Sequence, residues 1–374
     1  MKKRMITLAL ALSMALGMTA CQGKPESSST PAPTPAPAQT DGASSEPAET
    51  VPSEDPSVTF KCGLTFTLDD YRGEDLQWWA DRVHELSNGS VTIELYPSET
   101  LVKGTESVSA MVMGTIDMYL INTSYVEGSV PGLEAMNMPC TAPVKELTDR
   151  LQLCYDVTEA CHDQLFTAFD QAGVKYIGTI GQGGYVDMVF REPIRTAEEY
   201  TSWKVRTTGG ISDDILNALG CTPTFISSSD LYLSLQTGVV DGAMTTPNTI
   251  LNNKLYELCP YMVVPSINNN YSPYFVCCSN DAWDQLSENQ RKIMSDAARE
   301  CLARTVEVYP ERQNVDREKV KENLAEYIEL PDEEWAKMQE KMDPVYEAYA
   351  AEFDELGQEI YEIKCSVEDS FHNE

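Results

Sequence analysis

Residues 235–242 read LQTGVVDG, and this stretch carries the main signal for the fold of the 374-residue chain. A helix ends here, Gly238 takes the left-handed position that caps it, and Val239-Val240 begins a strand. Residues 111–117, MVMGTID, repeat this order of helix, glycine and strand. The repeat is either a chance recurrence of a common joint or the mark of two similarly built lobes. Two α/β lobes would place a ligand site in the crevice between them, at the strand ends.

Helix and strand patterns alternate on both sides of this stretch. Apolar residues recur on one helical face over 74–86, and they alternate with polar residues over 91–95. The same reasoning predicts helices at 106–113, 145–172, 212–219, 229–236 and 248–258, and strands at 58–60, 116–121, 174–180, 204–206, 239–244, 261–264 and 274–278. After Ser287, which has capping-box spacing with Gln290, the chain is mostly helical, and Pro331-Asp332 starts another helix. Such alternation predicts α/β domains with largely parallel sheets.

The charge balance limits the partners of the protein. The chain has 27 Lys and Arg residues against 59 Asp and Glu residues, a formal net charge of −32. This charge argues against binding nucleic acid or an anionic lipid surface through a broad basic face, so we expect no nucleic-acid partner. It does not exclude one buried basic residue that meets a small anion. A hydrophobic content of 42% excludes wholesale disorder, and the length suits two domains.

The N-terminus has the features of an export signal. Basic residues 2–4 precede an apolar run over 6–16, and the small residues Thr19 and Ala20 precede Cys21. We expect residues 1–20 to be a lipoprotein signal peptide and Cys21 to be lipidated; the alternative is an ordinary signal peptide cleaved nearby. Residues 22–57 are rich in Pro, Ser, Thr and Ala and have no aromatic residue, so residues 21–57 should be a lipidated cysteine with a disordered tether. The protein is then extracytoplasmic and lipid-anchored to the bacterial cell membrane.

The folded region divides in sequence into two lobes and an appendage. We expect lobe I to comprise residues 58–180 with roughly 268–300, and lobe II to comprise residues 181–267 with part of the C-terminal helices. Residues 301–374 should form a helical C-terminal region.

Cysteine and histidine give no sign of a metal or catalytic centre. The chain has 11 cysteines, so ten remain besides Cys21, and they form no CxxC pair. With only three histidines as well, we expect no metal site and no cofactor. Some cysteines could pair, or most could be buried free thiols. No GxSxG motif is present, and neither His84 nor His162 adjoins a nucleophile motif, so we expect no enzyme activity.

Several segments, in order, resemble one protein family. The segments are WADRVHELSNG at 79–89 with VTIELYP at 91–97, GTIDM at 114–118, PI at 193–194 with WKVR at 203–206, and DLY at 230–232 with LQTGVVDG at 235–242. Together they resemble the DctP-type extracytoplasmic solute receptors of TRAP transporters. Phe275 and residues 283–286 resemble a further family segment. The resemblance covers about residues 58–305. It implies an α/β, two-lobed periplasmic-binding-protein-like fold, type II-like, with a hinge and long C-terminal helices.

The resemblance also implies a ligand and a set of contacts. Members of this family close two lobes over a small organic anion, typically a carboxylate, and deliver it to the permease subunits of a TRAP transporter. Their ligand-binding arginine falls on Arg206, whose planar guanidinium suits a carboxylate. The second arginine of many members is replaced near Tyr185, and Asp187 would repel an anion. The expected supporting residues are Tyr185, Thr245, Thr246 and Asn248, with Asn122 and Ser124 on the side of lobe I.

These departures favour a monocarboxylate with an apolar or hydroxylated body over a dicarboxylate. Three other functions stay open: the substrate-binding lipoprotein of an ABC importer, a ligand-sensing lipoprotein, and, less favoured, an exported hydrolase.

Overall fold

The computed structural model describes residues 55–139, 146–182, 184, 186–264 and 273–372, all within one unit that comprises residues 50–374. The predicted signal peptide, Cys21, nearly all of the predicted tether, Cys140 and Tyr185 lie outside the described residues.

A first sheet of five strands has the order β2-β1-β3-β10-β4. Its strands are β1 (Val58–Gly63), β2 (Val91–Tyr96), β3 (Met118–Asn122), β4 (Val174–Gln182) and β10 (Pro273–Ser279). β1 is parallel to β2 and β3, whereas β10 is antiparallel to both β3 and β4. Every residue of β3 and β10 is buried. A strand buried on both faces reads as a continuous apolar run, which is why both strands were recognisable in the sequence.

A second sheet of six strands has the order β11-β9-β5-β8-β6-β7. Its strands are β5 (Asp187–Phe190), β6 (Lys204–Thr207), β7 (Thr222–Phe225), β8 (Gly242–Thr245), β9 (Tyr261–Val264) and β11 (Glu326–Glu329). β5 is antiparallel to β8 and β9, and the other described pairs are parallel. The expectation of largely parallel sheets is therefore wrong, since both sheets are mixed. Burial patterns report which faces of a strand are covered, but they carry no information on its direction.

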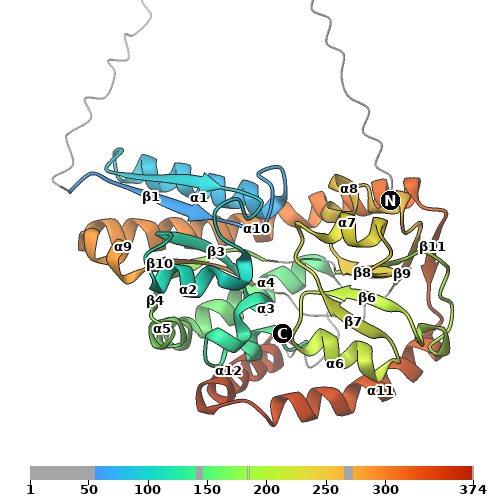
Figure 1. Ribbon diagram of the computed structural model, residues 1–374. Coiled ribbons are helices and arrows are strands. Elements are labelled where there is room, and N and C mark those ends of the chain that lie inside the picture. The colour runs from blue at the N-terminus through green and yellow to red at the C-terminus, as the bar shows by residue number, and fades with distance from the viewer. Residues whose placement is uncertain (1–54, 140–145, 183, 185, 265–272, 373–374) are drawn as a thin grey trace, which may run out of the picture. The chain divides into compact units, whose positions relative to one another are not determined.

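Helices cover both sheets (Figure 1). The helices up to the end of β10 are α1 (Tyr71–Leu86), α2 (Ser107–Val112), α3 (Thr123–Val126), α4 (Leu147–Ala160), α5 (His162–Gln171), α6 (Ile211–Ala218), α7 (Leu231–Gln236) and α8 (Pro247–Asn252). Short 3₁₀ turns are η1 (Gly104–Glu106), η2 (Glu127–Ser129), η3 (Leu133–Asn137), η4 (Glu198–Tyr200) and η5 (Leu255–Glu257).

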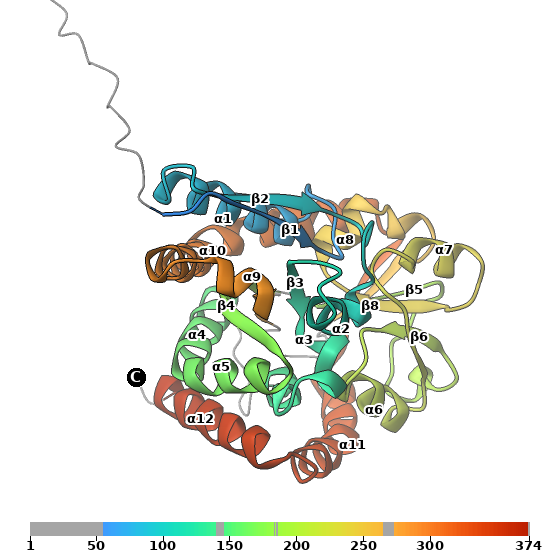
Figure 2. The ribbon, with the colours of Figure 1, turned by 60° about the vertical axis from the view of Figure 1, so that its left-hand side comes forward.

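The C-terminal quarter is mostly helical and contacts elements of both sheets. Its helices are α9 (Asn280–Gln285), α10 (Glu288–Asn323), α11 (Asp332–Ala350) and α12 (Glu355–His372). The 36-residue α10 packs against α1, α4 and β4 and also against α8 (Figure 1). α11 packs on α6, while α12 packs on α4 and α5 (Figure 2). The predicted capping box of Ser287 and Gln290 is confirmed, as is the helix that starts after Pro331.

Two predicted helices are shorter than expected. The helix expected at 145–172 is two helices that meet at Cys161, because α4 turns at this residue before α5 begins. The helix expected at 248–258 ends at Asn252, since Lys254 takes a left-handed backbone conformation with φ of 50°. A pattern of apolar residues continues through such a bend, so periodicity alone does not reveal it.

The internal repeat corresponds to equivalent joints in the two sheets. Gly114 and Gly238 have φ of 67° and 74°, and each lies between a helix and a strand near the middle of its sheet. Thr115 N donates to Ala110 O at 2.8 Å, and Val239 N donates to Ser234 O at 3.0 Å, the same step back along the chain. The sequence repeat therefore corresponds to the same local backbone structure in both sheets, as expected for two similarly built lobes. The boundaries of the lobes stay a prediction.

The described cysteines are free, and they are buried except for Cys365, which is partly exposed. Among the described residues, no helix combines the length and the apolar character needed to cross a bilayer.

Gly238 provides a test of the left-handed joint. A Cβ built at Gly238 meets nothing within 4 Å, so Gly238→Ala should destabilise only through its positive φ, by about 1 kcal/mol. Gly128 is the matched control, because its Cβ would also meet nothing and its φ is not positive. Urea unfolding should show a loss for Gly238→Ala and almost none for Gly128→Ala; equal effects would contradict the assignment.

Candidate ligand-binding site

A small cavity lies where strand ends of the two sheets come together. One wall of the cavity belongs to the first sheet and the helices packed on that sheet, and it comprises Arg72, Asn122, Ser124 and Tyr274. The other wall belongs to the second sheet and the loops next to its strands, and it comprises Val186, Arg206, Thr208, Ser228, Met244, Thr245 and Thr246. Asn122 and Thr245 are the last residues of β3 and β8, and Arg206 is next to the last in β6. The cavity volume is about 50 Å³, so a ligand of more than a few heavy atoms requires the walls to move apart.

Arg206 is the most deeply buried charged group of this cavity. Its side chain is 2% exposed and is held by three acceptors. Nε donates to Ile226 O at 2.8 Å, Nη1 donates to Met244 O at 2.8 Å, and Nη2 donates to Ser228 Oγ at 3.1 Å. An arginine has five N–H groups, so these three bonds leave one N–H on each terminal nitrogen, and the side chain of Tyr125 lies within hydrogen-bond reach of the guanidinium. These two donors form the fork that suits a carboxylate.

No carboxylate neutralises Arg206 within the described part of the chain. None lies within ion-pair distance of it, and no Asp or Glu lines the cavity. Burial lowers the pKa of Arg206, and the nearby positive charge of Arg72 lowers it further. A buried cation without a counter-ion is costly, and a bound anion would relieve that cost.

Four of the expected site residues lie on the cavity wall. Thr245 and Thr246 lie at the end of β8, and Asn122 and Ser124 lie at the start of α3. Thr246 also caps α8 by accepting from Thr249 N, and Asn122 caps α3 by accepting from Ser124 N at 3.1 Å. Both caps fix the backbone, and the Nδ2 group of Asn122 is left as a donor.

Asn248 is not on the cavity wall. It lies in the first turn of α8, where its Nδ2 donates to Asp316 Oδ2 of α10 at 3.5 Å. The helical turn that follows Thr246 directs this side chain toward α10, which a reading of consecutive residues could not reveal. Tyr185 lies outside the described residues, although Val186 beside it lines the cavity.

Asp187 does not face an incoming anion. It is fully buried at the start of β5 and forms an ion pair with Arg317 of α10. Burial raises the pKa of Asp187, and the charge of Arg317 opposes that rise. The expectation that Asp187 repels the ligand is therefore wrong, because its charge is turned toward α10 and paired there.

Sequence reasoning missed a second arginine. Arg72, in the first turn of α1, lines the cavity and is 7% exposed. It pairs with Asp70 and donates from Nη1 to Tyr274 Oη at 3.1 Å. Burial alone lowers the pKa of Arg72, but the charges of Asp70 and Tyr274 and their hydrogen bonds to the guanidinium together outweigh burial and raise it. The sequence indicated this arginine only by its place two residues after a possible N-cap residue. An arginine in that place is common on protein surfaces, so it does not point to a ligand site.

Polar contacts join the two walls near Arg206. Ser228 N donates to Tyr125 Oη of α3 at 3.0 Å, while Ser228 Oγ accepts from Arg206. Ser229 Oγ donates to Glu99 Oε2 at 2.7 Å, and Lys103 Nζ pairs with Asp230 at 3.3 Å. The 227–230 loop between β7 and α7 is therefore tied both to Arg206 and to the elements that follow β2.

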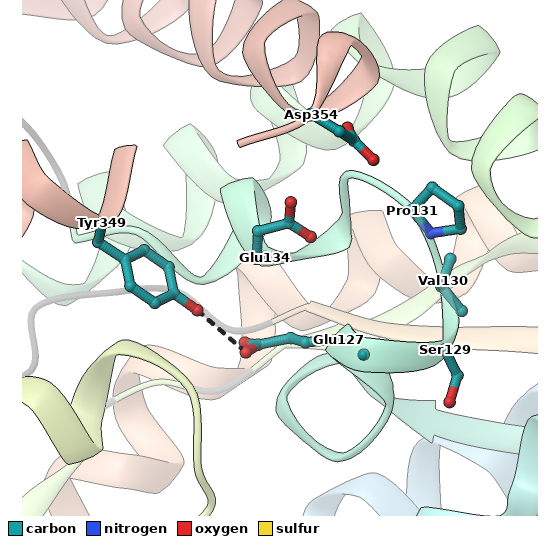
Figure 3. Close-up of a pocket in the computed structure, with 8 residues that line it drawn as sticks. Glu127, Ser129, Val130, Pro131, Glu134, Tyr349 and Asp354 are labelled. Atoms are coloured by element: carbon teal, nitrogen blue, oxygen red, sulfur yellow. Dashed lines mark hydrogen bonds between the residues drawn. The ribbon is translucent and has the colours of Figure 1, made fainter. Parts of the chain in front are cut away.

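Two larger hollows are less suited to an anion. One of about 430 Å³ is lined by Glu127, Glu134, Asp354 and Tyr349, among others, and has no Lys or Arg on its wall (Figure 3). Within the described residues no group of His, Cys, Asp or Glu is arranged to hold a metal ion. The other hollow, of about 360 Å³, has Lys103 on its wall together with Glu99 and Asp230, which pair with it. The small cavity with its two arginines is the best candidate site.

Two α/β lobes with a basic cavity at their strand ends define a solute-binding protein. The family of bacterial extracellular solute-binding proteins, family 7 (DctP), matches residues 65–352, well over half of the chain. The chain belongs to this family, whose members act outside the cytoplasm.

Relatives and solved structures agree with this assignment. The C4-dicarboxylate-binding protein DctB of Bacillus subtilis is 25% identical over 311 residues, which cover 82% of this chain and 87% of that protein. The sialic acid-binding periplasmic protein SiaP of Vibrio cholerae is 24% identical over 250 residues, or 66% and 74% of the two chains. A TRAP periplasmic solute-binding protein from Desulfovibrio salexigens, solved with bound orotic acid, is similar with a TM-score of 0.74 and 25% identity, covering 84% of this chain and 99% of that one. These relatives are solute-binding proteins, not enzymes.

The carboxyl group of Glu127 predicts a pH-dependent stability. Burial raises its pKa to about 7, although Asn137 and Tyr349 donate hydrogen bonds that oppose the rise. Between pH 4.5 and 7 the folded protein then binds more protons than the unfolded chain, so this contribution is full below pH 4.5 and is lost as the pH rises through 7. Glu127→Gln should flatten the fall in the free energy of unfolding over this window, by at most about 3 kcal/mol.

Chemical unfolding at pH 4.5–7.5 measures this effect. Exposed Glu352 is the control, and Glu352→Gln should keep the wild-type slope. Burial also raises the pKa of Asp75 to about 7, so Asp75 contributes to the same fall in the free energy of unfolding. Because Asp75 is present in every variant, part of the slope remains in each of them. A slope in Glu127→Gln equal to that of the wild type would contradict the prediction.

Proposed function

We propose that this protein is an extracytoplasmic receptor that binds a small organic acid through its carboxylate at Arg206 and delivers it to a TRAP-type transporter. The observation that carries the proposal is the burial of Arg206 without a carboxylate partner among the described residues. Its three fixed acceptors hold the guanidinium in place, so that a carboxylate meets two donors that are already oriented.

Binding proceeds in three steps. Open lobes admit the anion, Arg206 binds its carboxylate, and closure about the hinge buries the ligand. Thr245, Thr246, Asn122 and Ser124 offer hydroxyl and amide groups to the rest of the molecule, and Tyr185 is proposed to join them. Arg206 donates to Ser228 Oγ and Ser228 N donates to Tyr125 Oη, and these two hydrogen bonds link the ligand-binding group to the opposite wall. Closure thus completes polar contacts that would stabilise the bound state.

Organic acids are the ligand class that the relatives support. The ligands of these relatives include C4-dicarboxylates, sialic acid and orotic acid, and a solute receptor of Bordetella pertussis with the same fold binds pyroglutamic acid. For this chain we propose a monocarboxylate with an apolar or hydroxylated body, since Met244 and Val186 lie beside the hydroxyl groups on the wall.

The proposed cellular setting follows from the N-terminal sequence. Lipidation of Cys21 would hold the receptor at the outer face of the cell membrane, and residues 22–57 would let it reach the permease subunits. The TRAP assignment of relatives favours this transporter over an ABC importer or a sensor.

Removal of Arg206 tests the proposal. Arg206→Ala should abolish the thermal stabilisation that organic acids give the wild-type protein, with a loss in affinity worth about 3 kcal/mol or more. Arg206→Lys should also bind weakly, because an ammonium group lacks the planar fork. The measurement is a thermal-shift screen of organic acids on the wild-type protein, followed by titration of the active ones.

Arg195→Ala is the matched control for this experiment. Arg195 is exposed and pairs with Glu326 away from the cavity, so its removal should leave the ligand response unchanged. Near-native affinity in Arg206→Ala would refute the proposed site.

A further inference from the structure

The cavity contains a second arginine whose charge is already neutralised. Arg72 Nε donates to Asp70 Oδ1 at 2.6 Å, and Arg72 Nη2 donates to Asp70 Oδ2 at 2.5 Å. Both side chains are buried, with exposed fractions of 7% and 5%. Two parallel bonds between planar groups are the strongest geometry for such a pair. Arg72 therefore reaches the cavity as half of an ion pair, in contrast to Arg206.

The remaining contacts of Arg72 fix it in this position. Nη1 donates to Tyr274 Oη at 3.1 Å, Nη2 donates also to Thr249 Oγ1 at 3.1 Å, and the guanidinium lies 3.7 Å from the centre of the Phe66 ring. With the two bonds to Asp70, four of its five N–H groups have acceptors. One N–H on Nη1 is left, so Arg72 can assist a ligand but has no free fork for a second carboxylate.

The charges at the cavity favour a ligand with a single negative charge. Arg206 and Arg72 contribute +2 and Asp70 contributes −1, which leaves +1, and no other charged side chain among the described residues lines the cavity. A monocarboxylate would bring the buried sum to zero. A dicarboxylate would leave an excess of −1 in a buried site, which is unfavourable.

We propose that Asp70 is the positioning residue that sets the charge specificity of the site. By occupying the fork of Arg72, it restricts the cavity to monocarboxylates. Loss of its charge would free Arg72 to receive a second carboxylate. This inference rests on the proposed function, because it takes Arg206 as the anchor of the first carboxylate.

A purely structural role for Asp70 can be separated from this one. Asp70 caps α1 by accepting from Arg72 N at 3.1 Å. Asparagine and serine cap helices as well as aspartate does, so Asp70→Asn and Asp70→Ser keep the cap and remove the charge. Exposed Asp69 next to it provides the control, because Asp69→Asn makes the same change of charge without touching Arg72.

The experiment compares acids that differ by one carboxylate. The probes are acetate with malonate and L-lactate with L-malate, and the readout is the affinity from ligand-dependent thermal unfolding. In Asp70→Asn or Asp70→Ser the ratio of dicarboxylate to monocarboxylate affinity should rise at least about tenfold, as expected for a unit charge a few ångströms away. Asp69→Asn should keep the wild-type ratio. The double variant D70N/R72Q restores the charge balance and should return the ratio to that of the wild type.

The outcomes separate this inference from the proposed function. The inference is overturned if the ratio of dicarboxylate to monocarboxylate affinity in both Asp70 variants stays within twofold of the wild-type ratio. It is also overturned if these variants respond to neither dicarboxylate. Failure of both to fold also overturns it, since Asp70 would then be structural. If Arg206→Ala keeps its response to the monocarboxylates, the proposed function fails instead, whatever the Asp70 variants show.

Discussion

The burial of the Arg206 guanidinium is the constraint on which the site depends. Transfer of this charge from water to the interior is costly, and three neutral acceptors compensate it only in part. The carbonyl group of Ile226 and the hydroxyl of Ser228 come from the connection between β7 and α7, and the carbonyl group of Met244 comes from β8. The ends of these two segments must therefore be held together to bind the charge. Among the described residues, Arg206 thus has no carboxylate partner, and it lies at the place where the strand ends of the two sheets come together.

The rest of the fold serves to bring the opposite wall to that cation. The long helix α10 contacts elements of both sheets, while α11 and α12 pack on α6 and on α4. Arg72 reaches the cavity from α1 and is held there by Asp70 and Tyr274. Because Arg72 is paired with its own counter-ion, the cavity gains one directional N–H donor without a further unit of net charge.

The sequence was sufficient for features that depend on short segments. The capping box after Ser287, the joints at Gly114 and Gly238, and the placing of Arg206 near the end of a strand were predicted and agree with the structure. In contrast, Arg72 contacts Tyr274, which lies 202 positions away in the sequence, and local sequence patterns cannot predict such a contact. Asp187 was misjudged for the same reason, since its partner lies 130 positions further along the chain. Strand direction was missed because burial alone determines the apolar pattern.

A crystal structure of the protein with a bound organic acid is the most direct test of the central claim. We expect one carboxylate of the ligand within hydrogen-bond distance of both terminal nitrogens of Arg206, with Arg72 still paired to Asp70. A ligand whose carboxylate lies elsewhere, with Arg206 bonded only to Ile226, Met244 and Ser228, would show that Arg206 is not the anchor.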